Sequence, residues 1–334
     1  MLKIRNRHNI SPDWLAQKIS ALVDASKTLK SISNVHYSGH SWSIVKLLLL
    51  GGWVYVYTTI IPKYYEIYRY IDLLAGSGTT YVEETKDIVV GSAFVPFFLA
   101  QNPFTEYVFV ERNRDFRDAL QQRATGMRIG EKCSIYEGDC NIIINSLFPT
   151  AKNVHNLVFI DNQGFDVCWK TVELALSAET DILINFPTSS IKRIITEHSE
   201  SLDEFYGNHS WANGQNDEDY LRIYMEQLKR TFWERRRKPA YVSNIRAGNA
   251  QFFYDIILGC KNGAYVRAWE FLKEKLDWKD NKVIGTTLDI LNGRATRIDW
   301  FTGLQEEVES IENAEKEKTT STTTLDKWFV TPPR

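Results

Sequence analysis

A glycine-rich turn is the first feature of this sequence whose residue types and spacing could do chemistry. The segment YIDLLAGSGTT ends an apolar run at Asp72 and continues through Ala75, Gly76 and Gly78. Glycines at a strand-to-helix turn let the backbone come close to a ligand, and the free amide groups of such a turn suit a polar or anionic group. A G-x-G sequence alone is more often an ordinary tight turn, so other residues have to support a ligand site here.

Acidic residues supply that support, because they stand at the ends of successive apolar runs. Glu111 follows YVFV, Asp139 follows CSIYEG and Asp161 follows LVFI. The carboxyl ends of parallel strands form the ligand crevice of an open sheet, so Asp72 and these three residues should converge on one place. Each acid alone would be interpreted as a solvated surface group. Together they predict a ligand site, in which Glu111 can accept hydrogen bonds from ribose hydroxyls.

The elements that must position these residues alternate, from residue 69 onward, between short apolar runs and amphipathic stretches. This alternation predicts a parallel sheet with helices on both faces. Only residues 246–249 or so separate the last two apolar runs, which is too short for a crossover helix, so these strands should form an antiparallel hairpin. The predicted strands are Tyr70–Leu74, Tyr107–Val110, Cys133–Tyr136, Leu157–Ile160, Ile182–Asn185, Ala240–Ile245 and Phe252–Leu258, and the predicted helices include Ser92–Leu99, Arg114–Ala124 and Trp169–Leu176.

The same pattern predicts how the chain is divided. Residues 1–66 are typical of a helical N-terminal extension, and residues 67–275 of an α/β domain that a polar, aromatic-rich insertion interrupts at 187–238. Residues 276–312 are expected to form a small appended unit. Residues 313–334 are expected to form a flexible tail, because the stretch NAEKEKTTSTTT is too poor in apolar residues to support a core.

Composition and charge exclude several classes of protein. The 334 residues are 43% hydrophobic and 25% charged, which excludes a disordered, collagen-like or fibrous chain. With 40 Lys and Arg against 42 Asp and Glu the formal charge is −2, so a nucleic-acid partner would have to be bound through a local concentration of cations.

Cysteine spacing and hydropathy bear on where the protein works. The four cysteines form no C-x-x-C pair and have no histidine at metal-ligand spacing, so we expect neither a disulfide framework nor a metal site. The apolar run from Leu47 to Ile61 is shorter than the ~20 residues that span a bilayer, so a buried helix is favoured over a membrane segment. No signal sequence is recognisable, and a cytoplasmic protein is expected.

The glycine turn, the acidic strand ends and the terminal hairpin together resemble the class I S-adenosylmethionine (SAM)-dependent methyltransferases. The resemblance implies a Rossmann-like sheet of seven strands with an antiparallel last hairpin, and SAM as cofactor. It places Gly76 and Gly78 against the methionine part, Glu111 on the ribose and Asp139 on the adenine amino group, with Cys140 beside it. A dinucleotide dehydrogenase is the alternative, but it expects a third glycine where Tyr81 stands.

Eight segments are similar, in order and spacing, to the three-Cys-motif partner (TcmP) family. They are WSIVKLLLL, YIDLLAGSGTT, VVGSAF, YVFVERN, YEGDCN, LVFIDNQGF, TDILINF and YVSNIRAG. The similarity covers about residues 42 to 275. It implies a methyltransferase-like fold and a three-Cys-motif protein as a further partner.

The acceptor side of the site is expected directly after the fourth strand. Amino-methylating enzymes typically carry there an acidic or amide residue, two prolines and an aromatic residue; here the segment runs from Asp161 through Asn162 and Gln163 to Phe165. We therefore expect Asp161 to position the nucleophile, Phe165 to stack on the base and Asn162 to assist. The missing prolines leave a binding site without this chemistry as the alternative. The segment Asn185–Pro187 is a second candidate for lining the acceptor pocket.

Cations concentrate in one segment, KRTFWERRRK, which carries a local charge of +5 at residues 229–238. Guanidinium groups beside aromatic rings suit phosphates and unstacked bases, so the segment is a candidate nucleic-acid contact. The alternative is a solvated helix end, where cations also favour the helix dipole. The candidate contact residues are Lys229, Arg230, Trp233, Arg235, Arg236 and Arg237.

The end of the chain, TLDKWFVTPPR, is hydrophobic after a polar tether. Leu325, Trp328 and Phe329 have the spacing i, i+3, i+4, so one helical turn would put all three on one face. The segment resembles the PIP box of archaeal proteins that bind the DNA sliding clamp PCNA, with Thr322 in place of the usual glutamine. Folding back onto its own domain is the alternative.

Together these features predict a SAM-dependent methyltransferase that acts on nucleic acid, with the exocyclic amine of a DNA base as acceptor, recruited to the PCNA clamp through its tail. Such an enzyme would serve DNA modification, repair or replication. The alternative is a catalytically silent protein with the same fold that docks on the clamp and recruits a repair or defence partner.

Overall fold

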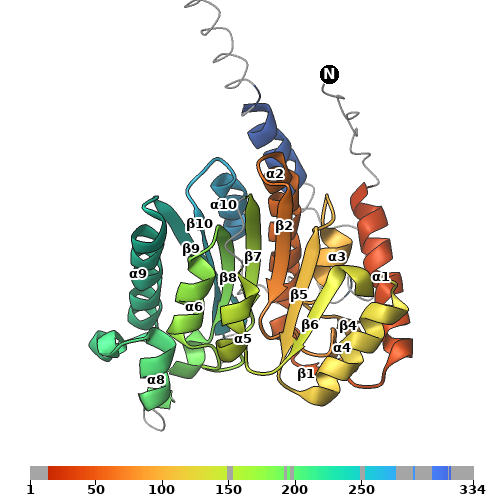
Figure 1. The fold of residues 1–334 in the computed structure, drawn as a ribbon, viewed down its shortest axis with the longest axis horizontal. Coiled ribbons are helices and arrows are strands. Elements are labelled where there is room, and N and C mark those ends of the chain that lie inside the picture. Colours follow the sequence, from red (N-terminus) through yellow and green to blue (C-terminus); the bar gives the residue numbers. More distant parts are fainter. Residues whose placement is uncertain are drawn as a thin grey trace, which may run out of the picture.

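The computed structural model describes residues 14–148, 153–191, 194–195, 199–248, 253–275, 289, 303–314 and 316. A seven-stranded sheet runs through its centre, in the order β6-β5-β2-β7-β8-β10-β9 (Figure 1). Five strands are parallel, and β10 pairs antiparallel with both β8 and β9. The strands are β2 (Ile67–Asp72), β5 (Glu106–Glu111), β6 (Cys133–Glu137), β7 (Val154–Ile160), β8 (Thr180–Phe186), β9 (Ala240–Gly248) and β10 (Phe253–Lys261).

This strand order confirms the predicted fold class. All seven predicted strands are present, and the last two form the expected antiparallel hairpin. Numbered along the chain within this sheet, the order is 3-2-1-4-5-7-6, so the sheet has the seven strands and the antiparallel last hairpin that the resemblance implies.

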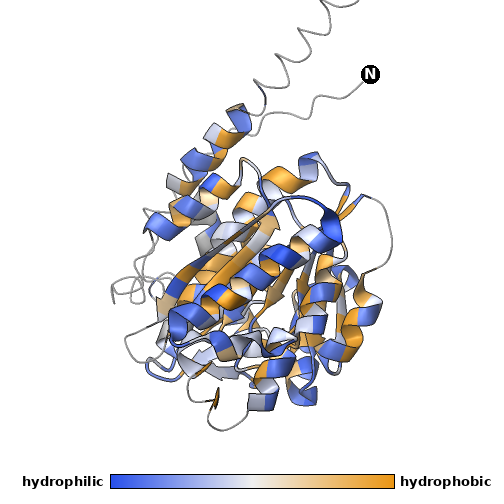
Figure 2. Cartoon of the chain, turned by 90° about the vertical axis from the view of Figure 1, so that its left-hand side faces the viewer, coloured by the Kyte–Doolittle hydropathy of each residue, from blue (hydrophilic) through white to orange (hydrophobic). Residues whose placement is uncertain are grey.

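Two layers of helices enclose the sheet, which explains why its strands are almost continuously apolar (Figure 2). One face is covered by α1 (Trp14–Ile32), α2 (Val45–Ile60), α3 (Val95–Leu99), α4 (Arg114–Gly126), α10 (Val266–Lys275) and helical residues 303–314. The other face is covered by α5 (Cys140–Leu147), α6 (Trp169–Leu176), α8 (Ser199–Tyr206) and α9 (Asp217–Arg236). Short 3-10 turns occur at η1 (Ser41–Ile44), η2 (Ile61–Lys63), η3 (Gly130–Lys132), η4 (Thr188–Ser190) and η5 (His209–Asn213).

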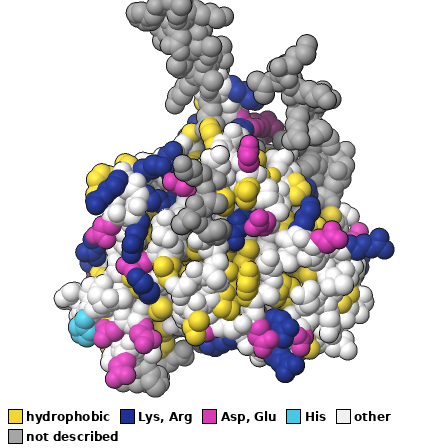
Figure 3. All heavy atoms as spheres, viewed as in Figure 1, with side chains coloured by type: hydrophobic (Ala, Val, Ile, Leu, Met, Phe, Trp, Pro, Cys, Tyr) yellow, Lys and Arg dark blue, Asp and Glu magenta, His cyan; other side chains and the backbone are white. Residues whose placement is uncertain are grey.

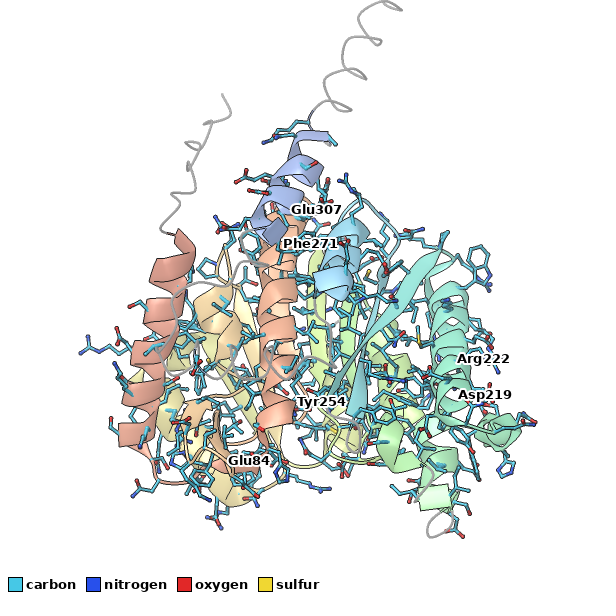
Figure 4. The ribbon with its side chains drawn as sticks, turned by 180° about the vertical axis from the view of Figure 1, so that it is seen from behind. Glu84, Asp219, Arg222, Tyr254, Phe271 and Glu307 are labelled. Atoms are coloured by element: carbon cyan, nitrogen blue, oxygen red, sulfur yellow. The ribbon has the colours of Figure 1, made fainter. Side chains whose placement is uncertain are left out.

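Helix α2 packs on one face of the sheet as a core element, as Figure 4 shows from behind. All of its residues are buried, and Trp53 packs edge-on against Trp269 of α10. The segment Val45–Lys63 is long and apolar enough to cross a membrane by length and composition, but 94% of it is buried inside the protein. The predicted buried helix is therefore confirmed.

A small second sheet stands beside the glycine turn and was not predicted. It joins β1 (Tyr37–Gly39), β3 (Thr79–Val82) and β4 (Ile88–Val90), with β1 parallel and β4 antiparallel to β3. The chain therefore enters a strand, not a helix, directly after the turn, and the N-terminal extension is not wholly helical. The predicted helix Ser92–Leu99 is shorter and begins at Val95.

Helices α1 and α2 of the predicted extension share one hydrophobic core with the sheet. Most of residues 276–302 and all of residues 317–334 lie outside the described residues, so the predicted division there stays a prediction.

Candidate functional site

A cavity of about 230 Å³ lies at the carboxyl ends of β2 and β5, where the glycine turn and the acidic strand ends meet. We call it the first cavity. Of the predicted cofactor residues, the structure brings Ala75, Gly76, Gly78 and Glu111 to its wall, together with Asp161 from the end of β7. Its other lining residues include Tyr37, Lys46, Arg112, Asn113, Phe116, Gln163 and Asp166.

The glycine turn requires glycine for two separate reasons. Gly76 and Gly78 have φ angles of 61° and 84°, in the left-handed region that L side chains rarely adopt. A Cβ atom on Gly78 would also lie 2.4 Å from the ring of Phe94. The backbone of the turn is therefore the surface that it presents to the first cavity.

The Glu111 side chain is hydrogen-bonded to the glycine turn. Its Oε2 accepts a hydrogen bond from the Gly76 amide at 2.8 Å, and its Oε1 accepts one from the Asn113 amide at 2.7 Å. Asn113 in turn caps the first turn of α4. Glu111 thus fixes the glycine turn against α4 while it stays on the wall of the cavity.

Asp72 lies beneath the turn and does not line the first cavity, although it was predicted to bind the cofactor. Its side chain is completely buried and accepts hydrogen bonds from the Leu74 amide and the Tyr70 hydroxyl. Burial raises the pKa of Asp72 to about 7. The residue supports the shape of the turn from inside.

Asp139 and Cys140 also stay outside the wall of the first cavity. Asp139 caps helix α5, where its Oδ1 accepts a hydrogen bond from the Asn141 amide at 2.8 Å. Cys140 is buried in the core under α5, and this burial raises the pKa of its thiol to about 12. Phe116 and Asp166 line the cavity instead, and neither was identified from the sequence.

The N-terminal segment contributes to the wall of the first cavity, which was not predicted from the sequence. Tyr37 of β1 lines the first cavity, and its amide donates a hydrogen bond to the Ser77 hydroxyl. Burial, together with the carboxylates of Asp161, Asp166 and Glu111, raises the pKa of the Tyr37 hydroxyl to about 12. The Tyr37 hydroxyl therefore stays protonated at neutral pH.

A second cavity of about 610 Å³ adjoins the first. Tyr37, Lys46 and Gln163 line both cavities. The predicted acceptor candidates Asn185 and Pro187 line the second one, and Tyr254 stands in its wall beside the end of α2 (Figure 4). Its lining is completed by Ser38, Gly39, His40, Asn162, Ser189, Ser190 and Phe253.

Lys46 and Asp161 form a nearly buried ion pair where the two cavities meet. The Lys46 Nζ lies 2.8 Å from Oδ1 and 2.7 Å from Oδ2 of Asp161, and both side chains are about one-tenth exposed. Asn185 donates a further hydrogen bond to Oδ1 at 2.9 Å. Asp161 lines only the first cavity. The acid expected to position the acceptor is thus held at the first cavity.

Of the other two predicted catalytic residues, one lies at a cavity and one in the core. Asn162 lines the second cavity. Phe165 lines neither cavity, because its ring packs edge-on against Phe205 at 4.8 Å in the core below α8. The expectation that Phe165 stacks on a base is therefore not supported by its position. The aromatic residues in the wall of the second cavity are Tyr37, Phe253 and Tyr254.

The basic segment at the end of α9 lies at the opposite edge of the sheet from the second cavity. Arg236 donates to the carbonyls of Leu176 and Ala178, just before β8 begins, whereas the second cavity lies where β8 ends. Arg236 is buried over the ring of Phe232 and is a structural residue.

Other members of the segment remain on the surface (Figure 3). Arg235 pairs with Glu173, and Trp233 is 52% exposed. Lys229, Arg230 and Arg237 are exposed and have no ion pair within the described part of the chain. The predicted clamp-binding residues Thr322, Leu325, Trp328 and Phe329 lie outside the described residues.

No family model and no curated protein matches this chain. Among solved structures, it resembles Trm1 from Pyrococcus horikoshii in complex with S-adenosyl-L-methionine, at 12% identity over 79% of this chain and 75% of that one, with a TM-score of 0.42. It also resembles the O-methyltransferase TomG from Streptomyces achromogenes in complex with SAM, at 12% identity over 74% and 90% of the two chains, with a TM-score of 0.38. A putative O-methyltransferase from Klebsiella pneumoniae has 9% identity over the same shares and a TM-score of 0.39.

These distant likenesses carry no conclusion about the reaction, and the resemblance to the TcmP family stays a prediction. The observed strand order establishes the fold independently of them. The chain has the seven-stranded α/β sheet of the class I methyltransferases, with a cavity at the edge where that sheet binds ligands.

Proposed function

We propose that this protein is a SAM-dependent methyltransferase whose acceptor is the exocyclic amine of a DNA base. The observation that carries the proposal is the pair of adjoining cavities: the first is formed by the glycine turn and Glu111, and the second meets it at Lys46 and Gln163. A transfer between two molecules needs two such sites in contact, because the reacting atoms must be held together.

The residues of the first cavity fit SAM. The turn at Gly76 and Gly78 presents backbone without side chains, which allows close approach of a ligand. Each carboxylate oxygen of Glu111 accepts one backbone hydrogen bond and keeps a lone pair with which it can accept from a ribose hydroxyl. When bound, SAM would supply a methyl group on its sulfonium, which the acceptor nitrogen's lone pair attacks as the carbon–sulfur bond breaks, before that nitrogen gives one proton to water.

The chain's own contribution is positional and electrostatic. Glu111 and the turn hold the cofactor, and Tyr37 of β1 closes the site from the N-terminal side. The Lys46–Asp161 pair places opposite charges at the junction with no net charge, so a neutral acceptor can approach without an uncompensated charge beside it. A DNA base has to be flipped out of the duplex, or presented in a single strand, to reach such a cavity.

A catalytically silent binding protein is the second candidate, and specific observations favour it. Phe165 packs in the core, Asp161 is held by Lys46 and Asn185, and Asn162 and Gln163 replace the prolines. The same fold would then bind its ligand without transferring a methyl group.

Calorimetry with SAM tests the first step. We expect binding by the wild-type protein and at least about tenfold weaker binding by Gly78→Ala, because the added Cβ requires a strained φ and collides with Phe94. Gly164→Ala is the matched control, since a Cβ there meets nothing within 4 Å. Absence of heat with an intact wild-type fold would contradict the proposal.

Transfer of labelled methyl from SAM to single-stranded DNA, compared with RNA, tests the second step. Methylated DNA supports the enzyme, and labelled RNA alone would move the acceptor to RNA. Bound SAM without transfer to either polymer would favour the silent protein.

The tail completes the proposal, with residues 322–329 docking on the sliding clamp as a short helical plug. Co-elution of the full chain with the clamp is expected, and the double variant Trp328→Ala, Phe329→Ala should lose it while it still binds SAM. Unchanged co-elution of that variant would exclude this mode of recruitment.

A further inference from the structure

We propose that Asn185 and Asn162, and not Asp161, recognise the acceptor, and that together they select an exocyclic amine next to an unprotonated ring nitrogen. The inference rests on the proposed function, because it names what the second cavity of that site binds. It moves the recognition of the amine from the loop after β7 to the end of β8.

The orientation of the Asn185 amide is set by its neighbours. Its Nδ2 donates to Asp161 Oδ1 at 2.9 Å and to the carbonyl oxygen of Asn162 at 3.0 Å. Both partners are acceptors only, so Nδ2 and Oδ1 cannot be exchanged without losing two hydrogen bonds. Asn185 Oδ1 is left with no hydrogen-bond partner.

Asn162 is oriented in the opposite sense. Its Oδ1 accepts a hydrogen bond from the Val167 amide at 3.3 Å. Its Nδ2, a donor, has no hydrogen-bond partner. Adjacent side chains thus carry one unused acceptor and one unused donor.

The place of the residues that carry these two atoms distinguishes them from other unpartnered groups. Asn162 and Asn185 are 2% and 7% exposed, and native proteins rarely leave a buried amide group unpaired. Among the unpartnered buried side-chain atoms of the described residues, these two belong to residues that line one of the two adjoining cavities. An incoming ligand that pairs with both atoms would remove the cost of leaving them unpaired.

The unused pair defines the chemistry of that ligand. Asn185 Oδ1 needs a donor, which an exocyclic amine supplies, and Asn162 Nδ2 needs an acceptor, which an adjoining ring nitrogen supplies. Adenine (N6 and N1) and cytosine (N4 and N3) present these groups side by side on the edge that a flipped base exposes. Both side chains are neutral, and so are these bases.

The ion pair with Lys46 explains why Asp161 does not recognise the acceptor amine. It holds both oxygens of Asp161 on the wall of the first cavity, while Asn162 and Asn185 line the second cavity alone. Asp161 then acts through Asn185, as the positioning residue whose Oδ1 fixes the amide orientation.

The test uses the full chain and single-stranded DNA in which one adenine stands among thymines. In a second oligonucleotide purine replaces this adenine and removes the amine, and in a third 1-deazaadenine removes the ring nitrogen N1. We expect each replacement to weaken binding to the wild-type protein about tenfold, as measured by fluorescence anisotropy, because each loses one hydrogen bond to a buried group. Equal affinity for all three would overturn the inference without any variant being made.

Two variants then assign the contacts. Asn185→Ala should bind the adenine and purine oligonucleotides equally and still discriminate against 1-deazaadenine, and Asn162→Ala should do the reverse. Asn145→Ala is the matched control, an exposed asparagine of α5 that lines neither cavity, and should keep both discriminations. A loss of both discriminations in either asparagine variant, or of neither, would overturn the assignment. For cytosine, 2-pyrimidinone and 3-deazacytosine make the same comparison.

Failure of the inference and failure of the proposed function can be told apart. Calorimetry with SAM on the same preparations reports the first cavity. If the wild-type protein binds no SAM, the proposed function fails. If SAM binds to all four proteins and the base discrimination does not follow Asn185 and Asn162, the inference alone fails.

Discussion

At the scale of single residues, Asp72 serves the site without touching the cavity. Its carboxyl group is buried under the glycine turn, where it accepts hydrogen bonds from the Leu74 amide and the Tyr70 hydroxyl. Burial opposes its ionisation, and its pKa is raised to about 7 from 3.8. A buried carboxyl group with a raised pKa makes the free energy of unfolding depend on pH.

The sign of that dependence follows from linkage. The folded protein holds the Asp72 proton to about pH 7, whereas the unfolded chain releases it near pH 4, so this contribution to stability is complete below pH 4 and is lost as pH rises to 7. The slope is about 1.4 kcal/mol per pH unit in this window.

Replacing Asp72 by Asn should remove this slope. Urea unfolding between pH 4 and pH 8 should show a flatter dependence of the free energy of unfolding for Asp72→Asn than for the wild-type protein. Asp24→Asn changes an exposed aspartate and should leave the wild-type slope. Identical slopes for the wild-type protein and Asp72→Asn would mean that Asp72 is ionised when folded.

Single residues also show how far the sequence predicts the site. Gly76, Gly78 and Glu111 were identifiable because the glycine turn occurs together with acidic residues at the ends of successive apolar runs, and only this combination indicates a ligand site. Lys46 was not, because it lies 115 residues from Asp161 and begins an apolar helix. Phe165 was expected to stack on a base, but its ring packs against Phe205, since loop composition does not determine which way an aromatic side chain points.

At the scale of elements, Arg123 of α4 ties the N-terminal segment to the glycine turn. Its side chain is fully buried and donates to the carbonyls of Leu29, Ser33 and Val35, and to that of Ser77 in the turn. Burial lowers the pKa of the Arg123 guanidinium to about 10, so it remains charged at neutral pH. One side chain thereby connects α1, the segment before β1 and the glycine turn.

We expect Arg123→Met to weaken the attachment of α1 and of the segment before β1 to the glycine turn. Four buried carbonyl groups would lose a charged donor, which should lower the free energy of unfolding by at least about 2 kcal/mol. Amide hydrogen exchange should become faster in residues 29–39 and 76–79, and SAM affinity should fall. Arg114→Met changes an exposed arginine of the same helix and should do neither. Unchanged exchange in both segments would contradict this role.

The elements themselves were largely predictable. Every strand of the main sheet was anticipated, because a parallel sheet covered on both faces produces short apolar runs. The small sheet was not, because β3 is stabilised by pairing with β1 from the N-terminal extension. Thr79–Val82 has the β-branched and aromatic composition of a strand, but its partner lies about forty residues away and the adjoining glycine turn suggested a helix.

At the scale of the whole molecule, the two edges of the sheet have different properties. The cavities occupy the carboxyl edge, and the exposed cations at the end of α9 stand at the amino edge. Helix α9 spans the distance between these edges with its 20 residues, so the edges lie about 30 Å apart. A nucleic acid with the 3.4 Å rise of a stacked duplex needs roughly nine nucleotides to reach both.

This separation predicts that the basic surface contributes affinity without contributing to base selection. The triple variant Lys229→Glu, Arg230→Glu, Arg237→Glu should bind a 20-nucleotide strand more weakly, with a salt dependence reduced by about 2, because contacts to phosphates are lost. It should bind a four-nucleotide strand and SAM as the wild-type protein does. Arg222→Glu is the control, since Arg222 lies on the same helix but is already paired with Asp219 and Glu226. If the four-nucleotide strand is weakened as much as the long one, the charges act near the cavity, and the separation of the two edges does not account for the affinity.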